Sequence, residues 1–76
     1  MKPRPVRITW NDAAHNGAGS WIDAADVDPR CRVVTVGVLL ARRRGHHIVA
    51  QSVQGDQATG VFTIPDAAIV RVEALR

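Results

Sequence analysis

Residues 31–41 read CRVVTVGVLLA, and the prediction of the fold class starts from this stretch. Its valines and threonine favour a strand over a helix, because branching at Cβ restricts the side chain on a helical turn. Side chains alternate between the two faces of a strand. One face then carries Val33, Thr35, Gly37 and Leu39, and the other carries Val34, Val36, Val38 and Leu40. Apolar residues on both faces and a central glycine predict a strongly bent strand that is buried on both sides.

Four more strands are predicted around this one, over residues 6–10, 46–53, 58–64 and 69–75. A connection rich in Asp, Asn, Gly and Ala spans residues 11–30, and Arg42–Gly45 and Gln54–Gln57 are predicted as turns. Pro65 has no N–H to donate, so residues 65–68 are expected to form one 3₁₀ turn. This order predicts an all-β fold, a small five-stranded barrel of the Sm-like or Src-homology-like type whose closed sheet leaves no free edge.

The length of the chain allows one small domain. Its 76 residues are expected to bury only about 60% of the surface that the unfolded chain exposes. We assign residues 1–5 to a flexible basic arm and residues 6–76 to the barrel. The single cysteine, Cys31, excludes an internal disulfide, and a domain this small without such a link is expected to form a homo-oligomer. Since no apolar run reaches the length of a membrane span, we expect a cytoplasmic protein with no membrane contact.

The most distinctive chemical feature is the run Arg42-Arg43-Arg44, followed by His46 and His47. Guanidinium groups bind phosphate through two hydrogen bonds and stay charged at any working pH. The formal net charge of +3 permits phosphate contacts without requiring them. Two readings therefore stay open for these five residues: a solvated turn, or a site for RNA, DNA or a nucleotide assisted by Arg4 and Arg7.

The two tryptophans are expected to play different parts. Trp10 alternates with Val6 and Ile8, which predicts a place in the core. Trp21 lies in the long connection and is expected to cap one end of the barrel, where it pins the loop together with Ile22; the alternative is stacking on a base. We count Trp21 with the arginines and histidines as a candidate ligand-binding residue.

Residues for catalysis or for a metal ion do not form a recognisable pattern. Adjacent His46 and His47 are expected to project to opposite faces of a strand, so they cannot share an ion. Neither a nucleophile motif nor a phosphate-binding loop is present in the sequence. We expect no enzyme, no catalytic residue, no metal and no cofactor.

A set of scattered residues forms a further pattern: Trp10-Asn11-Asp12-Ala13, Trp21, Thr35-Val36-Gly37-Val38-Leu39, Ala50-Gln51-Ser52, Ile64-Pro65, Ile69 and Leu75. This pattern resembles a group of short proteins encoded by tailed bacteriophages. The run Arg42–His47 departs from that group, whose members carry acidic or mixed turns there. Residues 65–72 are also similar to the closing segment of bacterial Sm-like RNA chaperones. The histidine of those chaperones is absent, and Ala67 and Ala68 occupy its place.

Three functions follow as hypotheses. The first, which the phage resemblance favours, is a binding module that counters a host factor by capturing a nucleotide-type ligand, such as a cyclic dinucleotide defence signal, between subunits. The second is an Sm-like RNA- or DNA-binding protein. The third is a protein-binding inhibitor of a host enzyme, which would use an exposed apolar patch or a sheet edge.

Overall fold

The computed structural model describes residues 3–12, 21, 23–26 and 31–75, and every structural statement below concerns these residues. They form β1 (Pro5–Asn11), β2 (Arg32–Arg43), β3 (His46–Ala50), β4 (Ser52–Gln54), β5 (Gln57–Thr59), β6 (Phe62–Pro65) and β7 (Ile69–Ala74). Two 3₁₀ turns, η2 (Ala24–Asp26) and η3 (Asp66–Ala68), complete the described structure. The predicted all-β class and the 3₁₀ turn before the last strand are confirmed.

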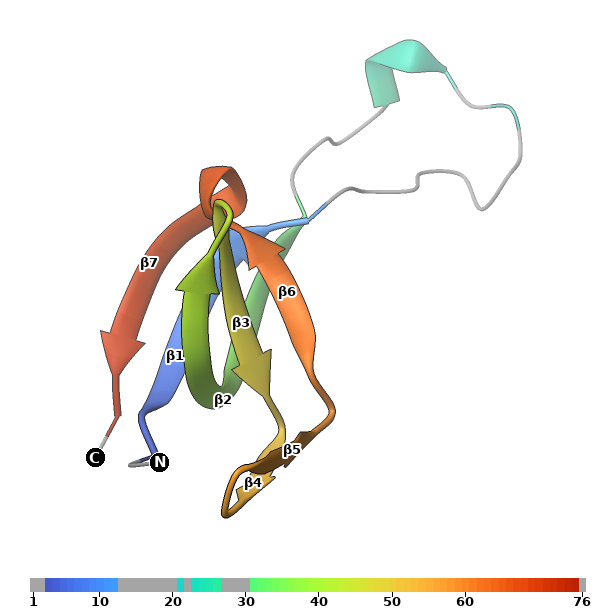
Figure 1. Ribbon diagram of the computed structural model, residues 1–76. Coiled ribbons are helices and arrows are strands. Elements are labelled where there is room, and N and C mark those ends of the chain that lie inside the picture. Colours follow the sequence, from blue (N-terminus) through green and yellow to red (C-terminus); the bar gives the residue numbers. More distant parts are fainter. Residues whose placement is uncertain (1–2, 13–20, 22, 27–30, 76) are drawn as a thin grey trace.

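Five strands form one antiparallel sheet in the order β6-β3-β2-β1-β7 (Figure 1). The first strand therefore lies between the second and the last. The sheet begins at Pro5, which pairs with Val38, and the carbonyl oxygen of Arg4 accepts a hydrogen bond from the amide of Leu39. The ordered sheet thus includes Pro5 and is tied to Arg4, two residues that we had assigned to the arm.

The core lies on the concave face of this sheet, where four strands contribute side chains. Its buried members are Val6, Ile8, Leu39, Val49 and Ile64. Trp10 packs against the cluster, as its alternation predicts. Its ring is partly buried, and the indole Nε1–H donates a hydrogen bond to Thr35 Oγ1 at 3.0 Å. This bond joins β1 to β2 above the core.

The long strand β2 bends at its middle because it belongs to two ladders. Its first half pairs with β1, its second half pairs with β3, and Val38 has a partner in both, Pro5 and Ala50. Beside Val38, a Cβ on Gly37 would lie 2.8 Å from the carbonyl oxygen of Ala50. Only glycine allows this approach, since a contact with backbone cannot be relieved by a side-chain rotation.

One prediction about β2 is wrong: it is not buried on both faces. The side chains of Val34 and Val36 are 58% and 64% exposed. Five strands supply one layer, and no second layer among the described residues covers the outer face. The run of branched residues therefore predicted the strand correctly. It did not predict that one face of the strand is exposed to solvent.

The third and fourth predicted strands each divide into two, so that the hairpin is longer and more bent than expected. The break falls between Ala50 and Ser52 on one side and between Thr59 and Phe62 on the other. The amide of Gln51 donates to the carbonyl oxygens of both Thr59 and Gly60, at 3.1 and 3.2 Å, which interrupts the regular ladder. The outer pieces, β4 and β5, form a separate two-stranded sheet that projects at one end (Figure 1).

The predicted closure of the barrel is also wrong. No ladder joins β6 to β7 in the described chain. The strand β6 has four residues and ends at Pro65, which cannot donate, and η3 then carries the chain across to β1. The two unjoined edges leave apolar side chains exposed. Phe62 pairs with buried Val49 at one edge and is 41% exposed, and Val72 pairs with buried Ile8 at the other edge and is 39% exposed.

An exposed ion-pair cluster joins the outer face of β1 to β7. Arg7 donates from Nε and Nη2 to the two carboxylate oxygens of Glu73, at 3.2 and 2.9 Å, and Arg71 Nε donates to the same carboxylate at 3.1 Å. The hydrogen bond from Arg7 is the largest cause that lowers the pKa of Glu73 below its ordinary value. Loss of hydration, the next largest effect, raises this pKa, and the charges of Arg7 and Arg71 together with the hydrogen bond from Arg71 lower it further.

The stability of the fold should depend on pH through Glu73. A lowered pKa in the folded state stabilises the protein above the pKa of the unfolded chain, and this contribution is lost as the pH falls through the folded value. We predict that Arg7→Gln moves the pKa of Glu73 back up towards its ordinary value, and that Arg71→Gln moves it up by less. Titration of the Glu73 carboxyl carbon by NMR measures both shifts; an unchanged pKa in Arg7→Gln would contradict the ion pair.

Substitution of Gly37 tests the bend of β2. We expect Gly37→Ala to lower the free energy of unfolding by about 1–3 kcal/mol, because the added methyl group meets the Ala50 carbonyl. The control is Val36→Thr, at the exposed neighbouring position, which should stay within about 0.5 kcal/mol of the parent. Urea unfolding compares the two variants, and a Gly37→Ala protein as stable as the control would show that β2 does not bend against Ala50.

Candidate functional site

The arginine run lies on the hairpin between β2 and β3, and its turn is shorter than predicted. Arg42 and Arg43 belong to β2, β3 begins at His46, and only Arg44 and Gly45 form the turn. Both turn residues have positive φ, 53° and 73°, which defines the two-residue turn that matches the twist of the flanking strands. We had expected Arg42–Gly45 to be a four-residue turn; pairing of Arg42 and Arg43 with β3 extends the ladder instead.

Cross-strand pairing divides the cationic residues between the two faces of the hairpin. Arg43 pairs with His46, and Arg42 pairs with His47. Successive side chains of a strand point to opposite faces, so the two histidines lie on opposite sides, as the sequence predicts. One face therefore carries Arg43 with His46 and the other carries Arg42 with His47, while Arg44 occupies the tip.

Hydrogen bonds to the backbone and to η3 fix the hairpin. His46 Nδ1 lies 2.8 Å from the carbonyl oxygen of Arg44, and His47 Nδ1 lies 2.7 Å from Asp66 Oδ1. The amide of Asp66 donates to the carbonyl oxygen of Gly45 at 2.8 Å. The turn and η3 lie side by side at one end of the sheet (Figure 1). The backbone that carries the arginines is thus held in place while their side chains extend from it.

The guanidinium groups of the hairpin are exposed and have no ion-pair partner among the described residues, unlike those elsewhere in the sheet. Arg7 and Arg71 bind Glu73, and Arg32 donates to the Asn11 side chain. Across the described residues, no carboxylate pairs with Arg42, Arg43 or Arg44. Asp66, whose amide contacts the turn at Gly45, directs its carboxylate to His47. Three permanent positive charges therefore face solvent on one tethered hairpin.

A shallow hollow of about 410 Å³ lies on one face of this hairpin. Arg43, Arg44 and His46 line it, together with Ile48 and Thr63. Sequence reasoning missed the last two because it treated the hairpin as an isolated turn. The pairing of Ile48 with Thr63 across β3 and β6 brings them there, and the alternation of His46 and Ile48 along one face was the available signal.

Trp21 is not part of this site within one chain. Its side chain is fully exposed, so it makes no contact with the arginines and does not cap the sheet, as we had expected. Ile22, the other half of the predicted pin, lies outside the described residues. Near Trp21 the connection forms the 3₁₀ turn η2 over Ala24–Asp26, where Asp23 Oδ1 accepts a hydrogen bond from the amide of Ala25 at 3.1 Å.

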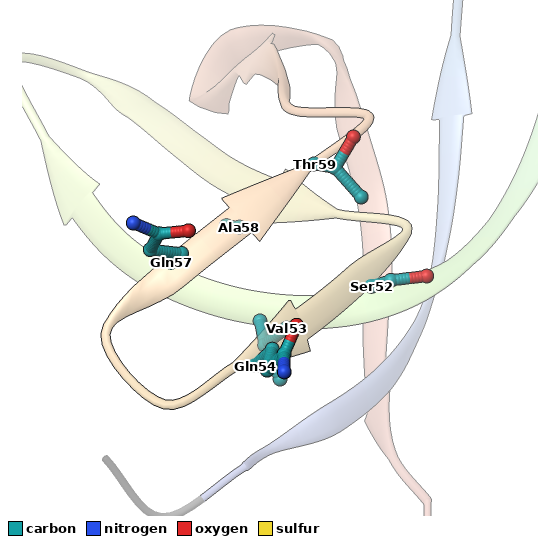
Figure 2. A pocket seen from close by; sticks show the side chains of 6 residues that line it. All are labelled: Ser52, Val53, Gln54, Gln57, Ala58 and Thr59. Carbon is teal, nitrogen blue, oxygen red and sulfur yellow. The ribbon is translucent and has the colours of Figure 1, made fainter.

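A second hollow, of about 430 Å³, lies against the β4–β5 hairpin (Figure 2). Its lining is Ser52, Val53, Gln54, Gln57, Ala58 and Thr59. None of these side chains is ionisable, so they cannot transfer protons near neutral pH. In Figure 2 the side chains of Gln54, Gln57 and Thr59 occupy separate points around the hairpin and do not converge. The arginine hairpin is therefore the better candidate for a functional site.

Two kinds of feature are absent from the described part of the chain, a group of metal ligands and a membrane-spanning helix. No three His, Cys, Asp or Glu side chains come together there in a way that would hold an ion. None of its helical segments has the length and apolar character needed to span a bilayer. Comparison of the chain with protein-family models, with curated proteins and with solved structures found no match.

The left-handed backbone of Arg44 provides a test of the turn. The left-handed conformation costs a residue with a Cβ about 1–2 kcal/mol of conformational free energy, and asparagine adopts it more readily than arginine does. We predict that Arg44→Asn raises the free energy of unfolding by about 1 kcal/mol and the melting temperature by roughly 4–8 °C. Arg43→Asn, at an ordinary strand position, should give no gain in a thermal melt. Equal melting temperatures for Arg44→Asn and Arg43→Asn would contradict this turn geometry.

Proposed function

We propose that the protein is a nucleic-acid-binding module that contacts the phosphate backbone through the β2–β3 hairpin. The observation that carries this proposal is the set of three exposed, unpaired guanidinium groups, Arg42–Arg44, on a hairpin whose backbone is tied to η3. A protruding cationic tip suits an extended polyanion, whose successive phosphates can meet successive guanidiniums.

The composition of the hollow supports the same proposal. Its two arginines and His46 supply donors for phosphate oxygens, Thr63 adds a hydroxyl, and Ile48 offers an apolar surface for a sugar or base. The presence of arginine at a left-handed position supports it as well. Asparagine or glycine would fit the turn at lower cost, so Arg44 occupies this position against the local backbone preference.

A second candidate is the capture of a nucleotide-type ligand, such as a cyclic dinucleotide of a host defence system. The full exposure of Trp21 favours it, since an uncovered indole is free to stack on a base. Because Trp21 and the arginines do not meet within one chain, this ligand would have to lie between two copies. The phage resemblance gives this candidate its biological setting.

Binding to oligonucleotides at two salt concentrations tests the first candidate. We predict that the parent protein binds single-stranded RNA or DNA with an affinity that falls steeply as salt rises. Arg43→Gln/Arg44→Gln should weaken binding roughly tenfold at low salt and reduce the slope of log K against log salt by about one to two. Fluorescence anisotropy of labelled oligonucleotides measures both quantities.

The matched control removes two arginines that already have partners. The control variant Arg7→Gln/Arg32→Gln changes the net charge by the same amount. At each salt concentration, its affinity should stay within about twofold of the affinity of the parent protein. Equal losses in the two double variants would mean that only overall charge matters. Binding of a cyclic dinucleotide that depends on Trp21 and hardly on salt would support the second candidate instead.

A further inference from the structure

The last strand, β7, has one free edge. It pairs with β1 through Arg7 and Glu73, and the amide of Leu75 donates to the carbonyl oxygen of Pro5 at 2.9 Å. In an antiparallel ladder, alternate residues direct their backbone groups to the same neighbour. Since residues 71, 73 and 75 face β1, the N–H and C=O groups of Val72 and Ala74 point away from it, where no described strand pairs with them.

This edge lacks two of the features that usually prevent strand addition, a very short strand and a proline. The other edge strand of the sheet, β6, is four residues long and ends in Pro65. In contrast, β7 has six residues, IVRVEA, with no proline and no lysine. An unprotected edge of this length is a template for another strand. The irregularity of the β1–β7 ladder at Thr9 and Trp10 affects only the start of β7, so its second half stays regular.

The sequence of β7 is complementary to itself in the antiparallel direction. If Val72 lies opposite Val72 of the partner subunit, the N–H and C=O groups of each residue point toward the other strand. The two residues then form a hydrogen-bonded pair. The same register places Arg71 opposite the partner's Glu73 and Glu73 opposite the partner's Arg71. Two cross-strand ion pairs then form on one side of the ladder, and no like charges meet.

The concave side of the same edge is apolar and incompletely covered. A groove of about 440 Å³ runs along it, and its apolar lining includes Val6, Leu39, Val72 and Leu75. Val72 is 39% exposed on this side although its cross-strand neighbour Ile8 is fully buried. In the register above, the partner's Val72 and Ala74 point to this side too, so an added strand would cover apolar surface as well as pair the edge.

We propose that β7 is a two-fold homodimer interface, in which two copies pair their β7 strands antiparallel about Val72. An interface of this type is isologous, because each copy offers the same strand to the other. The proposal is independent of the proposed function, since it uses none of the residues of the β2–β3 hairpin. Variants at position 72 therefore test the dimer, and variants at positions 43 and 44 test nucleic-acid binding.

The decisive experiment places charge on the two-fold axis. We expect the parent protein to have twice the 8.2 kDa monomer mass by light scattering. Val72→Lys and Val72→Asp should each be monomeric, because like charges would lie directly opposite each other. An equimolar mixture of the two variants should recover the dimer mass. The control Val36→Lys, at an exposed position on a central strand, should remain dimeric.

Several results would overturn the proposal: a parent protein that is monomeric at every concentration, a Val72→Lys protein that stays dimeric, or a mixture of folded variants that does not reassociate. Circular dichroism shows whether each variant is folded. If the charged variants do not fold, hydrogen exchange on the parent protein decides the question. Slow exchange of the Val72 and Ala74 amides that becomes faster on dilution supports the dimer, and fast exchange at all concentrations contradicts it.

Discussion

The rest of the structure depends on the bend of β2 at Gly37. This strand belongs to both ladders of the central sheet, with β1 along its first half and with β3 along its second. The bend brings the carbonyl of Ala50 so close that no side chain fits at residue 37. It also gathers the buried side chains of four strands on one concave face. Without it, the sheet would lie flatter and the small cluster around Ile8, Val49 and Ile64 would not form.

The same strand carries the candidate site. Its second half runs without interruption into the hairpin, so the pairing that holds the core also orients Arg42 and Arg43. The bonds from η3 to Gly45 and to His47 then fix the tip. Charge is distributed unequally as a result. Arg7 and Arg71 pair with Glu73 on the β1–β7 side, whereas no described carboxylate pairs with the arginines of the hairpin. This contrast, more than the net charge, supports the hairpin as the candidate site.

Much of the fold followed from local pattern, and the errors have a common cause. Alternation at Val6, Ile8 and Trp10, glycine at residue 37 and proline at residue 65 each act over a few residues. The packing of Trp10 against the core, the bend of β2 and the 3₁₀ turn were predicted from them and agree with the structure. Closure of the barrel, burial of Val34 and the place of Trp21 depend on which distant elements meet. Which arginines have an acidic partner also depends on contacts between distant parts of the chain. Arg7 pairs with Glu73, which is separated from it by almost the whole sequence. Sequence alone identified the cationic run but could not show that its charges are unpaired.

The most direct test of the account is a map of the surface that a short single-stranded oligonucleotide touches. Titration into isotopically labelled protein, followed by backbone amide shifts, gives this map residue by residue. If the β2–β3 hairpin binds nucleic acid, the shifts will concentrate on residues 42–47 and on Ile48 and Thr63, with little change in β4, β5 and β7. Shifts centred on the β4–β5 hairpin, or no shifts at low salt, would contradict it.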